Sequence, residues 1–94
     1  MTTPDIATST KPAIGRGFRL QWEPAQNAHV LLYPEGMIKL NTSAGEILKR
    51  CDGEHTVHEI VEQLETAFAT GGLSADVTAF VSMAVSRRWL ELRE

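Results

Sequence analysis

Three histidines are the first residues to consider for chemistry, because imidazole is the commonest metal ligand and acid–base group near neutral pH. His55 and His58 lie three residues apart at the start of a predicted helix, where Glu59 or Glu62 could add a carboxylate. A zinc site needs three or four suitably spaced ligands, and no third ligand here has convincing spacing. We therefore interpret both histidines as solvated residues around a helix start, we place His29 on a strand surface, and we expect no metal.

The other reactive side chains do not combine into a catalytic site. Cys51 is the only cysteine, so it forms no internal disulfide or thiolate cluster, and we expect a small buried residue rather than a reactive thiol. Asp52 and Glu54 flank a glycine and are interpreted as a polar turn. Residues 15–17, Gly-Arg-Gly, lack the lysine, hydroxyl residue and helix that follow a phosphate-binding loop. We predict that the protein is not an enzyme and holds no cofactor.

Composition and charge narrow the class of protein further. The chain has 94 residues, of which 43% are hydrophobic, and this suits one domain with a small core. A net charge of −3 and a pI near 5.6 disfavour binding to nucleic acid and to anionic membranes. No apolar run approaches the roughly 20 residues of a membrane span, and the first twelve residues lack the apolar stretch of a signal peptide. We expect a cytoplasmic location.

The first part of the chain divides into a tail and a small sheet. Residues 1–17 are rich in Thr, Ser, Pro and Gly without an apolar period, which predicts a tail without regular structure unless it lies on something such as a second copy. Residues 18–23 alternate apolar and polar side chains, residues 29–33 are β-prone, and residues 37–40 return as a short strand. Because short turns join them, we predict a three-stranded meander within a single domain, residues 18–94.

After the third strand the apolar period becomes that of helices. Ser43 with Glu46, and Thr56 with Glu59, fit the capping box, in which a hydroxyl and a carboxylate satisfy free backbone N–H groups. The second helix carries one apolar stripe that runs to residue 68, and Ser74 can cap a third helix. Residues 89–92 close the chain, either as a helix end or as a brief extended segment.

The resulting fold class is α+β: a winged-helix-like domain in which a three-stranded antiparallel sheet is followed by a three-helix bundle. Such a shape permits DNA binding through the N-terminal part of the third helix. Asp76 in that part would face the phosphates unfavourably, and Arg87 and Arg88 lie at the far end of the helix. The charge therefore indicates a ligand other than DNA, and DNA binding stays an alternative.

A short edge strand is the feature that most directly indicates a binding site. If residues 37–40 lie at an edge, their unpaired backbone groups can accept another strand, and neighbouring pockets can select its side chains. The third helix could form one wall of such a groove, in part through an adaptable methionine, or the same residues could belong to the core. The predicted peptide-binding residues are Met37, Ile38, Lys39, Leu40, Phe80, Met83, Ala84, Arg87 and Arg88.

A longer pattern connects this site to a family. Residues 33–41, Tyr-Pro-Glu-Gly-Met-Ile-Lys-Leu-Asn, closely resemble the signature segment of the PqqD family, and residues 43–48 and 51–53 continue the resemblance. It covers roughly residues 18–92, although residues 69–72 and the N-terminal tail are less typical. Further matches at suitable spacing are Thr56-Val57, Glu59-Ile60-Val61, Leu64, Asp76-Val77, Phe80 and Arg88-Trp89-Leu90.

The resemblance implies a domain that recognises the leader of a ribosomally made precursor peptide, PqqA in this family. It further implies presentation of PqqA to PqqE, a radical S-adenosylmethionine enzyme that cross-links a Glu and a Tyr of the peptide. The iron–sulfur clusters would belong to PqqE, in agreement with the single cysteine of this chain. PqqA would add a strand beside residues 37–40, and Arg87 and Arg88 would attract its acidic residues. A structural dimerisation module, with a second copy as partner, is the other alternative.

Overall fold

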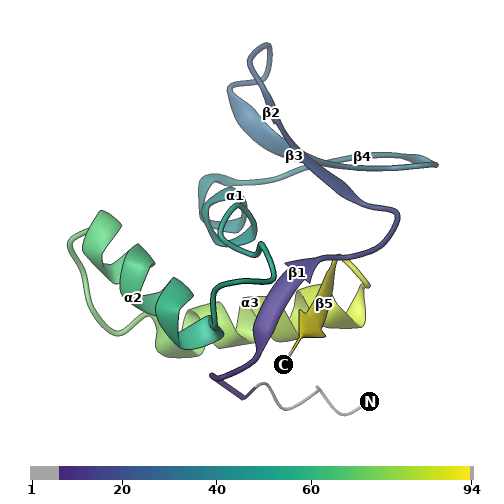
Figure 1. Ribbon diagram of the computed structural model, residues 1–94. Helices are drawn as coiled ribbons and strands as arrows, with labels where there is room; N and C mark the ends of the chain where they lie inside the picture. The colour runs from purple at the N-terminus through teal and green to yellow at the C-terminus, as the bar shows by residue number, and fades with distance from the viewer. Residues whose placement is uncertain (1–6, 94) are drawn as a thin grey trace.

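The computed structural model describes residues 7–93. Figure 1 shows a meander above α1, with α2 and α3 below it and a second pair of strands beside α3. The predicted α+β class with three helices is confirmed, whereas the winged-helix likeness and the bundle stay predictions. The elements are β1 (Lys11–Ile14), β2 (Arg19–Glu23), β3 (Ala28–Tyr33), β4 (Gly36–Lys39), α1 (Thr42–Leu48), α2 (Val57–Ala67), α3 (Ser74–Ser86) and β5 (Leu90–Arg93).

The meander predicted from the alternating residues is confirmed. Its strands are antiparallel in the order β2–β3–β4, so β3 is central and β4 lies at an edge. Leu20, Leu31 and Ile38 stand opposite one another across the three strands and belong to, or pack against, the hydrophobic core. Because side chains alternate between the two faces of a sheet, this row fixes which face of the meander is buried.

The segment predicted to be a tail contains a strand, and in this respect the prediction is wrong. β1 pairs antiparallel with β5, from Lys11 opposite Arg93 to Ile14 opposite Leu90. The C-terminal strand of the same chain therefore orders this part of the segment. The two strands form a separate two-stranded sheet that the sequence did not predict. Residues 1–6 of the predicted tail lie outside the described residues.

β1 is also bonded on its other side, to the segment that leads into α2. The Gly53 N–H donates to the Pro12 carbonyl at 2.9 Å, and the Val57 N–H donates to the Thr10 carbonyl at 3.0 Å. The composition of residues 1–17 does not indicate this strand. β1 has only four residues, and because backbone bonds hold it on both sides it needs no alternation of apolar and polar side chains. Of the two possibilities for residues 89–92, the structure shows the extended one from Leu90 onward.

The predicted capping box of α2 is confirmed. The Thr56 hydroxyl accepts a hydrogen bond from the Glu59 N–H at 3.1 Å, and the Glu59 carboxylate accepts one from the Thr56 N–H at 2.8 Å. Two backbone N–H groups that have no partner within the helix are thereby satisfied.

The other two predicted caps are wrong. At α1 the cap is Asn41 rather than Ser43, since the Asn41 side-chain oxygen accepts from the Ala44 N–H at 2.8 Å. Asparagine is as good an N-cap as serine. At α3 the cap position is Leu73 rather than the predicted Ser74, and the Leu73 N–H donates to the Glu65 carboxylate of α2 at 3.0 Å.

The core joins both sheets to all three helices. Leu31 of β3, Leu48 of α1, Ile60 of α2, Val81 of α3 and Leu90 of β5 are all buried in one cluster. Within residues 7–93, no helix is both long enough and apolar enough to cross a membrane.

α1 approaches the meander closely at Gly45. A Cβ at this position would lie 2.8 Å from Nδ1 of His29, so the approach needs glycine. His29 is therefore half-buried rather than simply on the strand surface as predicted. Its ring packs edge-on against Trp22 with centroids 5.0 Å apart.

Candidate functional site

The open edge of β4 is the first part of the candidate site. β4 pairs with β3 on one side and with no other strand among residues 7–93. The Leu40 N–H donates to the His29 carbonyl at 3.0 Å, and antiparallel residue pairs alternate between bonded and non-bonded. In the observed register the next bonded pair is Leu31 with Ile38. The backbone groups of Ile38 therefore point toward β3.

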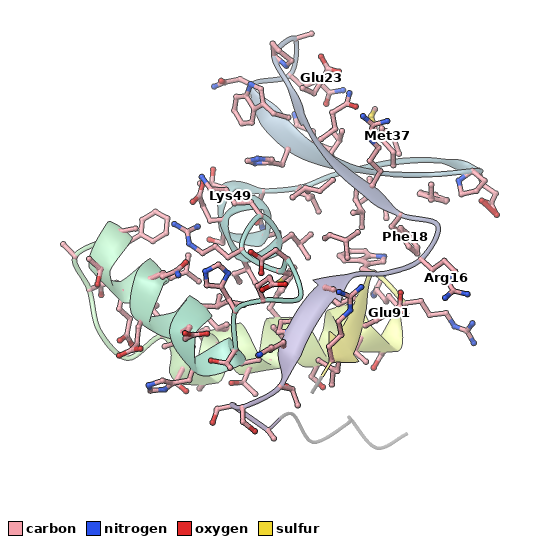
Figure 2. All side chains as sticks on the ribbon, viewed as in Figure 1. Arg16, Phe18, Glu23, Met37, Lys49 and Glu91 are labelled. Atoms are coloured by element: carbon pink, nitrogen blue, oxygen red, sulfur yellow. The ribbon has the colours of Figure 1, made fainter. Side chains whose placement is uncertain are left out.

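The backbone groups of Met37 and Lys39 consequently point to the open edge. Both side chains are exposed, that of Met37 by 48%, and Figure 2 shows Met37 on the side of β4 that faces away from α1. Ile38 is half-buried against the core. Leu40, also in the predicted peptide-binding set, is 5% exposed and its N–H is bonded to β3.

α3 provides fewer accessible residues than the sequence predicted. Phe80 and Met83 are half-buried, so part of each side chain remains open to a ligand. Ala84, predicted as part of the groove wall, is 0% exposed and belongs to the core cluster. The apolar residues of α3 spread around more than one face, and their period alone could not separate core positions from groove positions.

The two predicted arginines follow α3 in a fixed turn. The Arg88 N–H donates to the Val85 carbonyl at 3.0 Å and the Trp89 N–H donates to the Ala84 carbonyl at 2.9 Å, a pattern that ends helices through a left-handed residue. Arg88 is that residue, with φ at 67°. The Arg87 guanidinium lies 5.7 Å from the Trp89 ring centroid. Neither arginine forms an ion pair within the described part of the chain, so both charges are available to an acidic ligand.

β1 holds this turn from outside. The Gly15 N–H donates to the Trp89 carbonyl at 2.7 Å, and a Cβ on Gly15 would overlap the Arg88 carbonyl oxygen. The Arg16 N–H also donates to the Glu91 carboxylate, and Figure 2 shows the two residues side by side at this end of the molecule. The backbone that carries the arginines is therefore fixed by the chain's own N-terminal strand.

Sequence reasoning missed a pair of aromatic residues at the end of the meander where β3 turns into β4. The rings of Phe18 and Tyr33 lie with centroids 5.8 Å apart, and Tyr33 pairs with Gly36 at the start of β4. Both rings are half-buried, and Figure 2 shows Phe18 between the meander and the Arg16–Glu91 contact. Both residues continue the alternation that places Leu20 and Leu31 on the core side of the meander, and this alternation could have identified them. It does not show which positions lie beyond the part of the meander that the helices cover.

Cys51 has a structural role, as predicted. Its side chain is 2% exposed, and its sulfur lies 3.2 Å from the Ile47 carbonyl oxygen as a hydrogen-bond donor. Burial raises the pKa of the Cys51 thiol to about 12. Because the thiolate is the reactive form, this thiol is inert near neutral pH.

The polar turn predicted at Asp52 is confirmed. The Asp52 carboxylate accepts hydrogen bonds from the backbone N–H groups of Glu54 and His55 at 2.9 and 3.1 Å. The bond from the Glu54 N–H is the main reason that the pKa of Asp52 is lowered, and the His55 ring adds to it. His58 instead faces Glu62 at 3.5 Å. Within residues 7–93, no three His, Cys, Asp or Glu side chains are grouped so as to hold a metal.

Comparisons with known proteins point in one direction. The family model described as coenzyme PQQ synthesis protein D (PqqD) matches residues 28–90. A PqqA binding protein of Stutzerimonas stutzeri (strain A1501) is 52% identical over 90 residues, which cover 95% of this chain and 98% of that protein. A PqqA binding protein of Acinetobacter baylyi is 47% identical over 85 residues, which cover 89% of this chain and 86% of that protein.

A solved structure is similar along nearly the whole chain. It is the solution NMR structure of the PqqD truncation of Methylobacterium extorquens PqqCD, described as a functional, stand-alone recognition element for ribosomally synthesised and post-translationally modified peptides. The TM-score is 0.71 at 31% identity, and the match covers 97% of this chain and 99% of that one.

Proposed function

Because the chain belongs to the PqqD family, we propose that it is a non-catalytic peptide carrier of the cytoplasm, which binds PqqA and presents it to PqqE. Relatives that are 52% identical are named PqqA binding proteins, and the similar solved structure is a peptide recognition element. The buried cysteine, whose thiol pKa is raised, agrees with a binding role.

The open β4 edge is the observation that carries this proposal. A peptide strand beside β4 would bond to the outward backbone groups of Met37 and Lys39, which have no strand partner within the described chain. Strand addition of this kind takes its affinity from backbone bonds and its specificity from side-chain pockets. Alternate peptide side chains would then turn toward the core side of β4, where Ile38 is half-buried, and toward Phe80 of α3, which also packs against the core.

Arg87 and Arg88 would add charge selection to this site. Both lie at the C-terminal end of α3, and within residues 7–93 neither has an acidic partner. Acidic residues of the peptide would gain charge-assisted contacts there, and long-range attraction would speed the encounter. A peptide held on the carrier is then exposed to PqqE at an effective concentration that reaches roughly the millimolar range for short tethers.

A proline at Lys39 tests strand addition directly. Lys39→Pro removes an N–H that points to the open edge, whereas a proline at Ile38 would remove a bond to β3 and disturb the sheet itself. We expect Lys39→Pro to weaken PqqA binding in calorimetric titration by about tenfold or more, the equivalent of one lost backbone hydrogen bond with its partner left unpaired.

The matched control is Lys39→Val, which removes the same charge but keeps the N–H and favours a strand. It should bind PqqA within about threefold of the wild type, since an exposed charge contributes little. If Lys39→Pro is folded and binds PqqA normally, the peptide does not add a strand at β4. The same samples separate the alternatives: a salt-sensitive gel shift with duplex DNA supports DNA binding, and self-association without affinity for PqqA supports a dimerisation module.

A further inference from the structure

A pocket lined by two arginines lies where β1 and β5 meet the C-terminal end of α3. It has a volume of about 510 Å³, within the roughly 300–1,000 Å³ of small-molecule sites, and we call it the arginine pocket. Arg16, which follows β1, lines one side, and the end of α3 with β5 lines the rest. Figure 2 shows Arg16 beside Glu91 at this end of the molecule. The lining residues are Arg16, Val85, Arg88, Leu90 and Glu91.

Backbone bonds bring the two arginines together and leave their side chains free. The Arg16 N–H donates to the Glu91 carboxylate, and the Gly15 N–H donates to the Trp89 carbonyl at 2.7 Å. These bonds use the main chain of residues 15 and 16, so the Arg16 guanidinium takes no part in them. Within residues 7–93, neither Arg16 nor Arg88 forms an ion pair. Because a guanidinium is always charged, both are available to bind an anion.

The base of the arginine pocket is apolar. Leu90 is 1% exposed and belongs to the core cluster, and Val85 is half-buried against that cluster. The Arg88 N–H donates to the Val85 carbonyl at 3.0 Å, so this arginine is fixed directly beside the apolar surface. Arg16 and Arg88 are exposed. A ligand here would therefore meet guanidinium groups at the rim and aliphatic side chains at the base.

The charges of the pocket favour a singly charged anion. Two guanidiniums and the Glu91 carboxylate line it, which leaves an excess of one positive charge. A guanidinium binds a carboxylate or a phosphate through two parallel N–H bonds, but a phosphate monoester carries about −1.5 to −2 charges at pH 7. A carboxylate carries one, and the aliphatic chain attached to it would cover the apolar base.

We propose that the arginine pocket binds a carboxylate at the end of a short aliphatic chain, with the charged group between the two guanidiniums and the chain against the apolar base. The carboxylate can belong to an acidic side chain of PqqA or to a free organic acid. The first source rests on the proposed function, since it extends the peptide site from Arg88 to Arg16, which lies in a different part of the sequence.

Butanoate is the probe for this site, because it has the aliphatic chain and the carboxylate of a glutamate side chain. Titrated into the full chain and followed by NMR, it should cause saturable shifts in the methyl signals of Val85 and Leu90 and in the side-chain N–H signals of Arg16 and Arg88. Butanamide has nearly the same shape without the charge and should cause no saturable shift, and inorganic phosphate should bind more weakly. Equal affinity for butanamide or for phosphate would overturn the assignment to a carboxylate.

Arg16→Gln and Arg88→Gln should each weaken butanoate binding by about tenfold or more, as expected for the loss of a charge-assisted hydrogen bond. The first variant keeps the backbone N–H that bonds to Glu91. Arg19→Gln is the matched control, because Arg19 is also exposed but lies outside the pocket, and it should change the affinity by less than about twofold. Equal losses in all three variants would indicate attraction to general positive charge. That result would overturn the proposal, and so would wild-type affinity in Arg16→Gln and Arg88→Gln.

PqqA as a second probe distinguishes the two sources of the carboxylate. If an acidic side chain of the peptide fills the pocket, Arg16→Gln should bind PqqA about tenfold more weakly, and butanoate should compete with PqqA for the wild-type chain. If Arg16→Gln loses butanoate binding but binds PqqA normally, the ligand is a free organic acid. A wild-type chain that binds butanoate but not PqqA overturns the peptide-carrier function alone, whereas one that binds PqqA but not butanoate overturns the arginine pocket alone.

Discussion

The chain leaves α2 and α3 through the same backbone conformation, but the rest of the chain holds the two helix ends differently. Each helix ends through a non-glycine residue in the left-handed region, Ala69 at φ 50° and Arg88 at φ 67°. After α3 the chain is bonded at once to Gly15, the residue that follows β1, through the Gly15 N–H and the Trp89 carbonyl, and it continues as β5, which pairs with β1. After α2 it passes through Gly71, where an added Cβ would meet nothing within 4 Å.

This difference bears on the proposed peptide site. Strand addition needs a backbone in fixed register, because a slip of one residue turns every side chain to the other face. The register of β4, where strand addition is proposed, is set by its pairing with β3. The end of α3 that carries the arginines is held separately, by the segment of β1 and Gly15 and by β5. The end of α2, by contrast, is followed by an open loop, in which Gly71 has no close neighbour.

Among the variants that test this comparison, Gly15→Ala should lose the most stability. The new Cβ would overlap the Arg88 carbonyl oxygen, which is backbone and has little room to move. We expect a loss of about 2 kcal/mol or more in the free energy of unfolding, near the upper part of the range for overpacking, measured by urea denaturation. PqqA binding should also weaken, because the turn that carries Arg87 and Arg88 shifts.

Gly71→Ala is the matched control at the other end. A Cβ there meets nothing, so the free energy of unfolding should stay within about 0.5 kcal/mol of the wild type or rise slightly as the unfolded chain loses freedom. Equal losses in the two variants would show that β1 does not hold the end of α3 more tightly than the loop holds the end of α2, and the contrast between the two regions would fail.

The sequence predicted the elements whose signals are local. The β2–β4 meander follows from alternation and short turns, and the α2 capping box from Thr56 and Glu59, which are three residues apart. The β1–β5 pair was missed because its partners come from the two ends of the chain. The four residues of β1 carry no alternation, and the alternation of β5 covers only four residues, too few to exclude a helix end. The caps of α1 and α3 were missed because several polar residues compete there, and only the tertiary bond to Glu65 decides the second.

The candidate site was predicted in the same uneven way. Turn spacing placed β4 at an edge, but which of its residues face outward depends on the hydrogen-bond register. Ala84 was taken for a groove residue and is core, because helical spacing shows a face without showing what covers it. Phe68 continues the apolar stripe of α2 and was interpreted as part of it, and only the structure shows that nearly half of its surface is exposed.

Replacing each of the two left-handed residues with glycine should change stability by a smaller amount. Ala69→Gly and Arg88→Gly should each raise the free energy of unfolding by about 0.5–1 kcal/mol in urea denaturation, since glycine adopts positive φ without steric cost. The two variants should differ in function, because Arg88→Gly also removes a charge proposed to attract PqqA. If Ala69→Gly weakens PqqA binding as much as Arg88→Gly does, the peptide site is not confined to the end that carries the arginines.

A fall in pH should lower the free energy of unfolding through carboxyls that lie in one part of the molecule. Each carboxyl should contribute less than the substitutions described above. The pKa values of three carboxyls are lowered: Glu46 chiefly by a hydrogen bond from Arg50, Asp52 by the Glu54 N–H, and Glu59 by the Thr56 N–H. All three lie between α1 and the first turn of α2. A lowered folded-state pKa means that the stabilisation is present above the ordinary pKa and is lost as pH falls through the lowered value.

Glu59→Gln isolates this contribution, because glutamine keeps an oxygen that can accept from the Thr56 N–H but does not titrate. At neutral pH the wild type should unfold at a slightly higher urea concentration than Glu59→Gln. The ordinary pKa of this carboxyl is near 4.5, so the gap between the two midpoints should narrow as pH falls below that value. A gap that stays constant down to about pH 3, where a free Glu is largely protonated, would show that the ionised Glu59 carboxylate does not stabilise the start of α2.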